Sequence, residues 1–413
     1  MSAFVKSKAS CSNNYNCGVR KMKKLFCNAK IVVSGKYITG SVLVHDGTII
    51  DILPSGADIS AIDAEIIDCS DLYLGPGLID IHVHGGMGVD FIDADAYDIA
   101  KGIGYHLSMG TTSIVPSCIS VPFNTISGAI DNLKQAAKTV KSTVLGFHIE
   151  GIYLDEEYRG GHLKDYLCLP DPAEYMPLIE EHGDYITEWT LAPELGGSIE
   201  LIKKCREYGI VSSAGHTQAS YDTMMKAIDA GLTHTTHFVC AMGTLRDEAL
   251  GETPGTGYAP GVVETVLLDD RLTTEVIADG IHLHPAIIQL AFKCKGVGGL
   301  CIVSDSMMGV GLPPNEYVIG GQDCIVDHGI AILKDRPNMI ASSVTPMIDM
   351  LRFVVNRCGI LLYDAWEMSS LTAAKIIRFD EKKGSIEAGK DADIVLLDND
   401  LKLAGVYAAG TLI

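Results

Sequence analysis

Two histidines in the stretch PGLIDIHVHGG, residues 76–86, are the first groups in this chain that suggest chemistry. The flanking Leu, Ile and Val residues favour a β-strand, and residues two apart on a strand point to the same face. The imidazoles of His82 and His84 are therefore expected to lie side by side. Such a pair can begin a metal site, and two ordinary polar residues at a strand end are the simpler alternative.

More histidines and acidic residues stand at the ends of other apolar runs. They are Glu150 in FHIEG, His216 in SAGH, His234 and His237 in THTTHF, Asp279 and His282 in ADGIH, and Asp305 in SDS. Each one alone is explained by a structural or solvated role. Together, in this order, they indicate the site of a metal-dependent hydrolase.

The elements that position these residues alternate between apolar, β-branched runs and helical segments. Strands are expected at 78–84, 112–116, 144–150, 187–191, 210–214, 234–238, 273–278 and 300–304, with helices at 94–108, 124–141, 199–208 and 221–230. Eight buried parallel strands joined by crossovers predict an α/β fold, the (β/α)8 TIM barrel. In that fold the chemistry lies where the strands end, which is where the polar residues stand.

Both ends of the chain show a different residue pattern. Short alternating runs separated by Gly and Asp-Gly turns fill the region before residue 75 and the last thirty or so residues, as in small β-domains. We expect a disordered extension at 1–21, a composite small β-sandwich domain from 22–75 and 385–413, and a catalytic barrel at 76–384.

Composition excludes several classes of protein. The 413 residues are 47% hydrophobic and 20% charged, so the chain is globular. A net charge of −20 argues against nucleic acid or an anionic membrane as partner, and no apolar run reaches transmembrane length. Twelve cysteines without CxxC spacing favour reduced thiols, and hence a cytoplasmic protein.

Nine stretches resemble the N-acetylglucosamine-6-phosphate deacetylase family of the amidohydrolase superfamily. They are PGLIDIHVHG, HIEGIYL, RGGH, TLAPE, AGHTQASYD, THTTHF with the following AM, IADGIHLHP, VSDSM and KGSIEAGKDADIVLLD. The resemblance implies a divalent metal cofactor, one or two ions of Zn²⁺ or Fe²⁺. Its ligands would be Glu150, His216 and His237, with His82 and His84 for a second ion and Glu150 between the two.

A bridging lysine on strand four is common among amidohydrolases, but ITEWTLAPE has none, so Glu150 is the better candidate. His234 stands three residues before His237. Residues an odd number apart on a strand face opposite ways, so a structural role is expected for His234.

The resemblance also implies a mechanism. The metal would polarise the amide carbonyl and acidify a water, and Asp305 would take the proton from that water and pass it to the leaving amine. His162 in RGGH would bind the carbonyl oxygen or a sugar hydroxyl. His282, Cys240 and Ala241 would also contact the substrate, a small N-acetylated amino sugar phosphate, and the protein would be a homodimer.

The phosphate-binding positions depart from the family pattern. Cys240 replaces the usual Asn, and YAPG at 258–261 replaces REPG, whose Arg binds phosphate. Either Arg246 or another residue of an inserted loop restores the contact, or the substrate is an unphosphorylated N-acetyl sugar or another N-acyl compound. A non-catalytic metabolite-binding homologue is a third hypothesis, against which the presence of both Asp305 and His216 argues.

Overall fold

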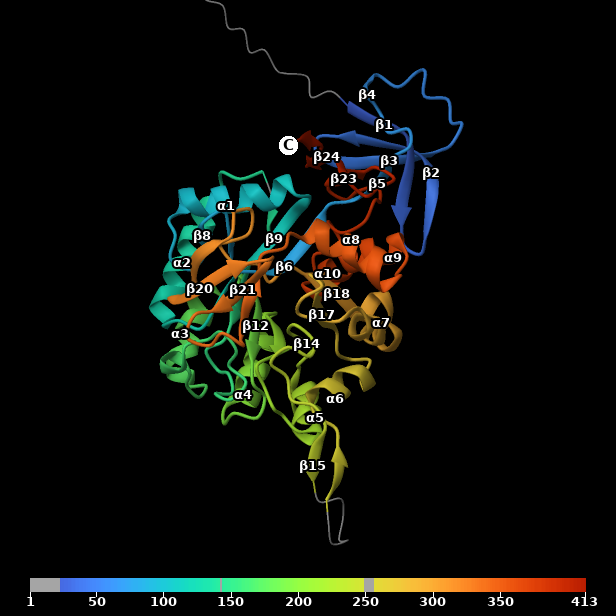
Figure 1. Cartoon of the computed structure of the whole chain (residues 1–413). Helices are drawn as coiled ribbons and strands as arrows, with labels where there is room; N and C mark the ends of the chain where they lie inside the picture. Colours follow the sequence, from blue (N-terminus) through green and yellow to red (C-terminus); the bar gives the residue numbers. More distant parts are fainter. Residues whose placement is uncertain (1–22, 142, 249–255) are drawn as a thin grey trace, which may run out of the picture.

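The computed structural model describes residues 23–141, 143–248 and 256–413, and the predicted extension at 1–21 lies outside them. Figure 1 shows a β-rich body formed by the blue and red ends of the chain beside a larger α/β body. Within the described residues, no helix is both long and apolar enough to cross a bilayer.

Eight parallel strands build the core of the larger body. They are β6 (Leu78–Val83), β9 (Thr111–Cys118), β11 (Phe147–Glu150), β12 (Ile186–Leu191), β13 (Val211–Ala214), β14 (His234–Thr235), β17 (Thr274–Ile277) and β18 (Leu300–Val303). Each overlaps one of the eight predicted runs. All of β9, like most of the others, is buried, as strands with helices on the outside and a packed interior must be.

The strands follow one another around a barrel. β6 pairs with β9, and β9, β11, β12, β13 and β14 pair in order, while β17 pairs with β18. Backbone hydrogen bonds close the two gaps: Phe238 donates to Glu275 at 2.8 Å, and Asp305 donates to His82 at 2.8 Å. The TIM-barrel prediction is therefore confirmed.

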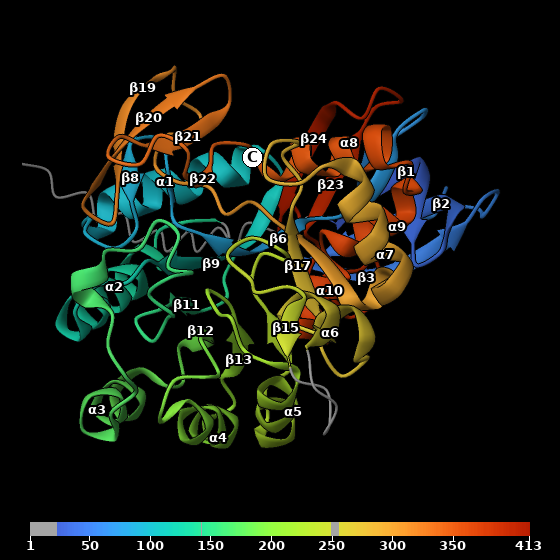
Figure 2. The same cartoon turned by 60° about the horizontal axis from the view of Figure 1, so that its bottom comes forward.

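Helices cover the outside of the barrel (Figure 2). They are α1 (Ala96–Ser108), α2 (Phe123–Ala136), α3 (Pro172–His182), α4 (Ser198–Tyr208), α5 (Tyr221–Ala230), α6 (Val262–Leu268), α7 (Pro285–Gly299), α8 (Met347–Cys358), α9 (Leu362–Met368) and α10 (Leu371–Ile376). Asp95 caps α1 by accepting from the amides of Tyr97 and Asp98, which satisfies otherwise unpaired N–H groups. The prediction for α2 was too long at its C-terminal end by five residues.

The β-rich body takes strands from both ends of the chain, as predicted. They are β1 (Lys23–Val33), β2 (Lys36–His45), β3 (Thr48–Pro54), β4 (Ala64–Asp68), β5 (Tyr73–Pro76), β23 (Ile394–Leu397), β24 (Leu403–Ala408) and β25 (Thr411–Leu412). All eight are hydrogen-bonded into one sheet, in which the C-terminal β23 pairs with the N-terminal β5.

A second small sheet follows the last barrel strand and was not predicted. Its antiparallel strands are β19 (Asn315–Ile319), β20 (Gln322–Asp327), β21 (Ile330–Leu333) and β22 (Ile340–Ser343). The remaining short elements are β7 (Gly85–Gly86), β8 (Val89–Asp90), β10 (Thr143–Val144), the 3-10 turn η1 (Lys164–Tyr166), and a hairpin of β15 (Arg246–Glu248) and β16 (Gly257–Ala259). In Figure 1 that hairpin projects from the barrel.

Candidate metal centre

The polar residues predicted at the strand ends converge on one rim of the barrel. Glu150 is the last residue of β11, and His216, His237 and Asp305 follow β13, β14 and β18. The last three have positive φ angles of 50°, 29° and 43°, a region that residues other than glycine seldom adopt. The chain thus turns sharply after each of these strands, and such conformations cluster at functional sites.

One half of the centre is built around a single carboxylate oxygen. Oε1 of Glu150 lies 3.1 Å from Nε2 of His216 and 3.0 Å from Nε2 of His237. The two Nε2 atoms are themselves only 3.0 Å apart. All three side chains are almost completely buried.

The other nitrogen of each ring decides which atoms face the centre. Nδ1 of His216 lies 2.9 Å from the Tyr158 carbonyl, and Nδ1 of His237 lies 3.0 Å from the Cys240 carbonyl. A carbonyl can only accept, so both Nδ1 atoms carry a proton, and the neutral form of each ring turns an Nε2 lone pair inward. Converging lone pairs and a carboxylate repel one another unless a cation lies between them. This donor set fits a divalent metal ion.

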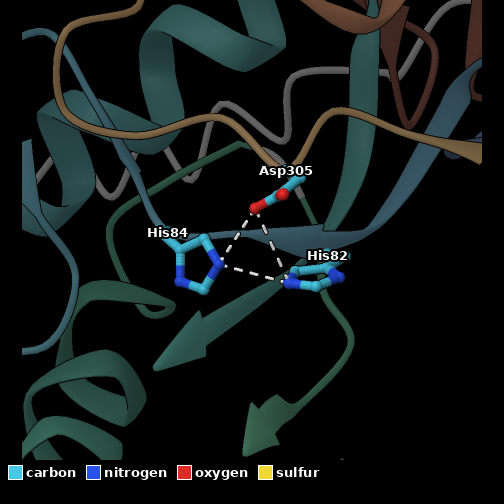
Figure 3. A group of neighbouring side chains, drawn as sticks. All are labelled: His82, His84 and Asp305. Carbon is cyan, nitrogen blue, oxygen red and sulfur yellow. Dashed lines mark hydrogen bonds and ion pairs between the residues drawn. The ribbon is translucent and has the colours of Figure 1, made fainter. Parts of the chain in front are cut away.

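The other half contains His82, His84 and Asp305, which Figure 3 shows turned toward one another. Nε2 of His84 lies 3.2 Å from Nε2 of His82 and 3.1 Å from Oδ1 of Asp305. Glu150 also reaches this half, because its Oε2 lies 3.3 Å from Nε2 of His84. The HxH pair thus points to one face as predicted, and Glu150 stands between the two halves.

His162 enters the centre in a different chemical form. Its Nδ1 accepts from the backbone N–H of Ser120 at 3.1 Å, so the proton of the neutral ring is on Nε2, 3.5 Å from Oε2 of Glu150. Burial, together with the nearby His216, lowers the pKa of His162 to about 4, which keeps the ring neutral. His162 therefore presents a hydrogen-bond donor to the centre and not a lone pair.

The Asp305 carboxyl is ionised in this arrangement. Burial raises its pKa, but the charge of His82 and the hydrogen bond from His84 outweigh burial, and the pKa lies below its ordinary value. The Asp305 backbone is held on both sides: its N–H donates to His82 O, and its carbonyl accepts from Ser343 N–H at 2.9 Å. A carboxylate fixed beside the metal-ligand set is suited to accept a proton.

A cavity of about 720 Å³, including its open mouth, leads to the centre. Its walls contain His216, His237, Asp305, three of the predicted substrate-binding residues (Cys240, Ala241 and His282), and Gly160, Gly161, Ile277, Asn338, Met339, Ile340 and Ala341. The structure places the fourth, His162, against Glu150. None of the described residues that line this cavity is a lysine or an arginine.

Arg246 is not among the residues that line this cavity. It belongs to the projecting hairpin, where Nη1 donates to the Gln218 carbonyl at 2.7 Å. Residues 249–255 of the inserted loop lie outside the described residues. The structure therefore brings together the predicted metal and acid–base residues, and none of the described residues that line the cavity is a lysine or an arginine.

The sequence did not reveal two parts of the site, and it gave the wrong side-chain direction for one residue. It missed the wall segment 338–341 because the sheet carrying it was not predicted. It also missed Glu275, whose carboxylate contacts both His82 and the backbone of His237. The expectation that His234 and His237 face opposite ways is wrong: β14 ends at Thr235, and both rings face the barrel interior, His234 toward Glu275 and His237 toward Glu150.

Comparison with known proteins agrees with this geometry. Residues 73–413 match the model of the amidohydrolase family. An N-acetylglucosamine-6-phosphate deacetylase of Bacillus subtilis is 33% identical over 84% of this chain and 86% of its own. The crystal structure of the Pasteurella multocida deacetylase of that name superposes with a TM-score of 0.86 at 30% identity, over 95% of this chain and 99% of the other.

A second solved structure, from Mycobacterium smegmatis, is a point mutant of N-acetyl-D-glucosamine-6-phosphate deacetylase in complex with N-acetyl-D-glucosamine-6-phosphate. It has a TM-score of 0.84 and 25% identity, over 95% of this chain and 99% of the other. The barrel, the strand-end centre and these similarities agree. The chain belongs to the amidohydrolase family, in its N-acetylglucosamine-6-phosphate deacetylase branch.

Proposed function

We propose that this protein hydrolyses the acetamide of N-acetylglucosamine-6-phosphate to acetate and glucosamine-6-phosphate. The observation that carries the proposal is the buried set of inward-facing lone pairs around Glu150, with the Asp305 carboxylate 3.1 Å from one of its histidines. Family membership supplies the reaction class, because the similar proteins are named as deacetylases of this substrate.

We assign the metal-holding role to Glu150, His216 and His237, and that of a second position to His82 and His84. One or two ions of Zn²⁺ or Fe²⁺ suit imidazole and carboxylate donors. When bound, such an ion polarises a carbonyl and lowers the pKa of a water. Because the rings of His82, His216 and His237 are each held by a second contact at Nδ1, they need little rearrangement to receive the ion.

Asp305 and His162 would have different roles in the hydrolysis: Asp305 would transfer a proton, and His162 would donate a hydrogen bond to the substrate. Asp305, which is ionised, takes one proton from the attacking water and delivers it to the nitrogen as the C–N bond breaks. The Nε2–H of His162 donates to the substrate, at the carbonyl oxygen or at a sugar hydroxyl. One water is consumed, and its oxygen ends in the acetate.

The far end of the substrate would lie against His282, Cys240 and Ala241. His282 is held by a 2.7 Å contact between its Nδ1 and Oδ2 of Asp279. A thiol and a methyl group bind phosphate poorly, whereas Arg binds it through two parallel hydrogen bonds. Phosphate recognition would therefore rest on His282 and on groups beyond the described cavity wall.

A second candidate function follows from the cavity wall. None of its described residues is a lysine or an arginine, which favours an unphosphorylated N-acetyl sugar or another N-acyl compound as substrate. The same centre and the same proton transfers would serve that reaction.

Acetate release by the metal-loaded protein tests these candidates. The substrates to compare are N-acetylglucosamine-6-phosphate, its galactosamine and mannosamine counterparts, and the three unphosphorylated sugars. We expect N-acetylglucosamine-6-phosphate to have the highest kcat/KM. If the phosphate makes no difference, the second candidate is correct, and if no N-acyl compound reacts, both are wrong.

We further propose a homodimer in the cytoplasm. All ten cysteines of the described residues carry free thiols, seven of them buried, which suits a reducing compartment. Light scattering of the purified protein would test the dimer, and a monomer at micromolar concentration would contradict it.

A further inference from the structure

Glu275 is a buried carboxylate to which the proposed reaction gives no role. It lies on β17 (Thr274–Ile277), and its side chain is fully inaccessible to solvent. A carboxylate in such a place is costly unless its oxygens receive hydrogen bonds. The groups that supply those bonds show what the residue does.

One oxygen of Glu275 contacts both halves of the metal centre. Oε1 lies 2.6 Å from Nδ1 of His82 and accepts from the backbone N–H of His237 at 2.9 Å. His82 comes from β6 and His237 from the turn after β14, on opposite sides of β17 and β18 in the barrel order. A single atom thus fixes one ligand of each half.

The contact with His82 sets which nitrogen that ring turns to the centre. An ionised carboxylate only accepts, so Nδ1 of His82 carries a proton, and Nε2 is the nitrogen that offers a lone pair when the ring is neutral. That Nε2 lies 3.2 Å from Nε2 of His84 and 3.5 Å from Oε1 of Glu150. Without Glu275 the ring could place its proton on Nε2, and in that form Nε2 has no lone pair to offer a metal.

The contact with His237 fixes its backbone. His237 has a φ of 29°, which costs free energy and persists only where neighbouring contacts impose it. The hydrogen bond from the His237 N–H to Glu275 is one such contact. The turn that it holds places Nε2 of His237 3.0 Å from Oε1 of Glu150.

The second oxygen of Glu275 faces the buried pair of His234 and Glu188. Oε2 lies 3.6 Å from Nε2 of His234, which in turn lies 4.0 Å from Oε1 of Glu188. Glu188 is also fully buried, but neither of its oxygens has a hydrogen-bond partner among the described residues. Glu188 thus offers a comparison: it is a carboxylate in the same interior with no hydrogen bond to a metal ligand.

We propose that Glu275 is a positioning residue for both halves of the metal centre, acting on the His82 ring and on the His237 backbone through one oxygen. This inference rests on the proposed function in one respect, that the centre holds a metal. It concerns the affinity for that metal and does not depend on which substrate is hydrolysed.

The experiment compares wild type with Glu275→Gln, Glu275→Ala and the matched control Glu188→Gln. Each protein is stripped with a chelator and titrated with Zn²⁺ against a competing chromophoric chelator, which gives the metal affinity without any activity assay. Bound zinc is counted by mass spectrometry, and circular dichroism with thermal unfolding establishes that each variant is folded.

The wild type is expected to bind metal, and Glu275→Ala to bind it about 10–100-fold more weakly, the usual effect of losing a group that orients a ligand. Glu275→Gln should fall between the two, because an amide oxygen still accepts but without charge. Glu188→Gln should match the wild type. At saturating zinc, Glu275→Ala should recover kcat with an unchanged KM, since a purely structural defect would not respond to metal.

Wild-type zinc affinity in Glu275→Gln and Glu275→Ala would overturn the inference. An equal loss in Glu188→Gln would also overturn it, because the effect would then belong to the buried charge in general. If Glu275→Ala fails to fold, the near-isosteric Glu275→Gln decides the question alone. A wild type that binds metal but releases no acetate contradicts the proposed function and leaves this test intact.

Discussion

Asp305 shows how the centre depends on single atoms. Its backbone is bonded to His82 and Ser343, so an amide in place of its carboxylate can keep the fold. The amide cannot accept a proton from water. We therefore expect Asp305→Asn to lower kcat by about 10²–10⁴-fold, the usual range for a general base.

Metal content measured on the same Asp305→Asn preparation separates this loss from loss of the ion. The variant should hold as much zinc as the wild type. Unchanged turnover would show that Asp305 is not the base, and loss of zinc would show that it is mainly a ligand.

Among the individual residues, the strand pattern predicted the direction of the two HxH side chains. The spacing of His82 and His84 placed both rings on one face, and their Nε2 atoms are 3.2 Å apart. His162 and Cys240 lie in loops, where spacing says nothing, and only the family resemblance pointed to them. Glu275 lies within a strand, so a search of strand ends did not include it. The alternation of inward-facing positions along that strand could have identified it.

Helix α1 carries a titratable group of its own. His106 is fully buried, and its Nε2 donates to the Gly85 carbonyl at 2.9 Å, while Nδ1 has no partner among the described residues. A second proton would leave a buried N–H unpaired. Burial accordingly lowers the pKa of His106 from 6.5 to about 4.

This shift predicts a pH dependence of stability. The folded state binds fewer protons here than the unfolded state, so stability is lost as pH falls from 6.5 toward 4, by up to about 1.4 kcal/mol per pH unit. Urea unfolding of chelator-treated wild type and His106→Gln should show a shallower slope in the variant. Equal slopes over that interval would contradict the assignment.

At the element scale, all eight barrel strands were found because each is a short apolar run that must be buried. The end of β14 was predicted wrongly. The chain leaves the strand after Thr235 and has positive φ angles at His237 and Val239, which the local sequence pattern does not indicate. The sheet β19–β22 was missed although its Gly-Gly and His-Gly turns are visible at residues 320–321 and 328–329. An antiparallel sheet has no position in the strand–helix repeat of a barrel, so the barrel pattern did not indicate it.

For the molecule as a whole, the two bodies meet at Gly75 and Trp366. Trp366 of α9 is fully buried, and its Nε1 donates to the Pro76 carbonyl at 2.8 Å. A Cβ at Gly75 would lie 2.2 Å from the Trp366 ring. The sequence predicted both bodies, but local patterns cannot specify which side chains meet between them.

Gly75→Ala should therefore destabilise the protein by about 1–3 kcal/mol through overpacking. Gly104→Ala is the control: Gly104 lies on the exposed side of α1 with nothing within 4 Å of a new Cβ, and alanine should stabilise that helix by about 0.4–1 kcal/mol. Denaturant unfolding of the two variants should shift in opposite directions. A Gly75→Ala protein as stable as wild type would show that this contact between the bodies is loose.

We propose that the rim around Glu150 is a metal centre at which an acetyl group is removed. The most direct measurement is the rate of acetate release from N-acetylglucosamine-6-phosphate as zinc or ferrous iron is added back to chelator-stripped protein. We predict no release without metal and a rate that rises in proportion to bound metal up to one or two ions per chain. Full activity in the stripped protein, or none at any metal content, would show that this rim is not a metal-dependent deacetylase site.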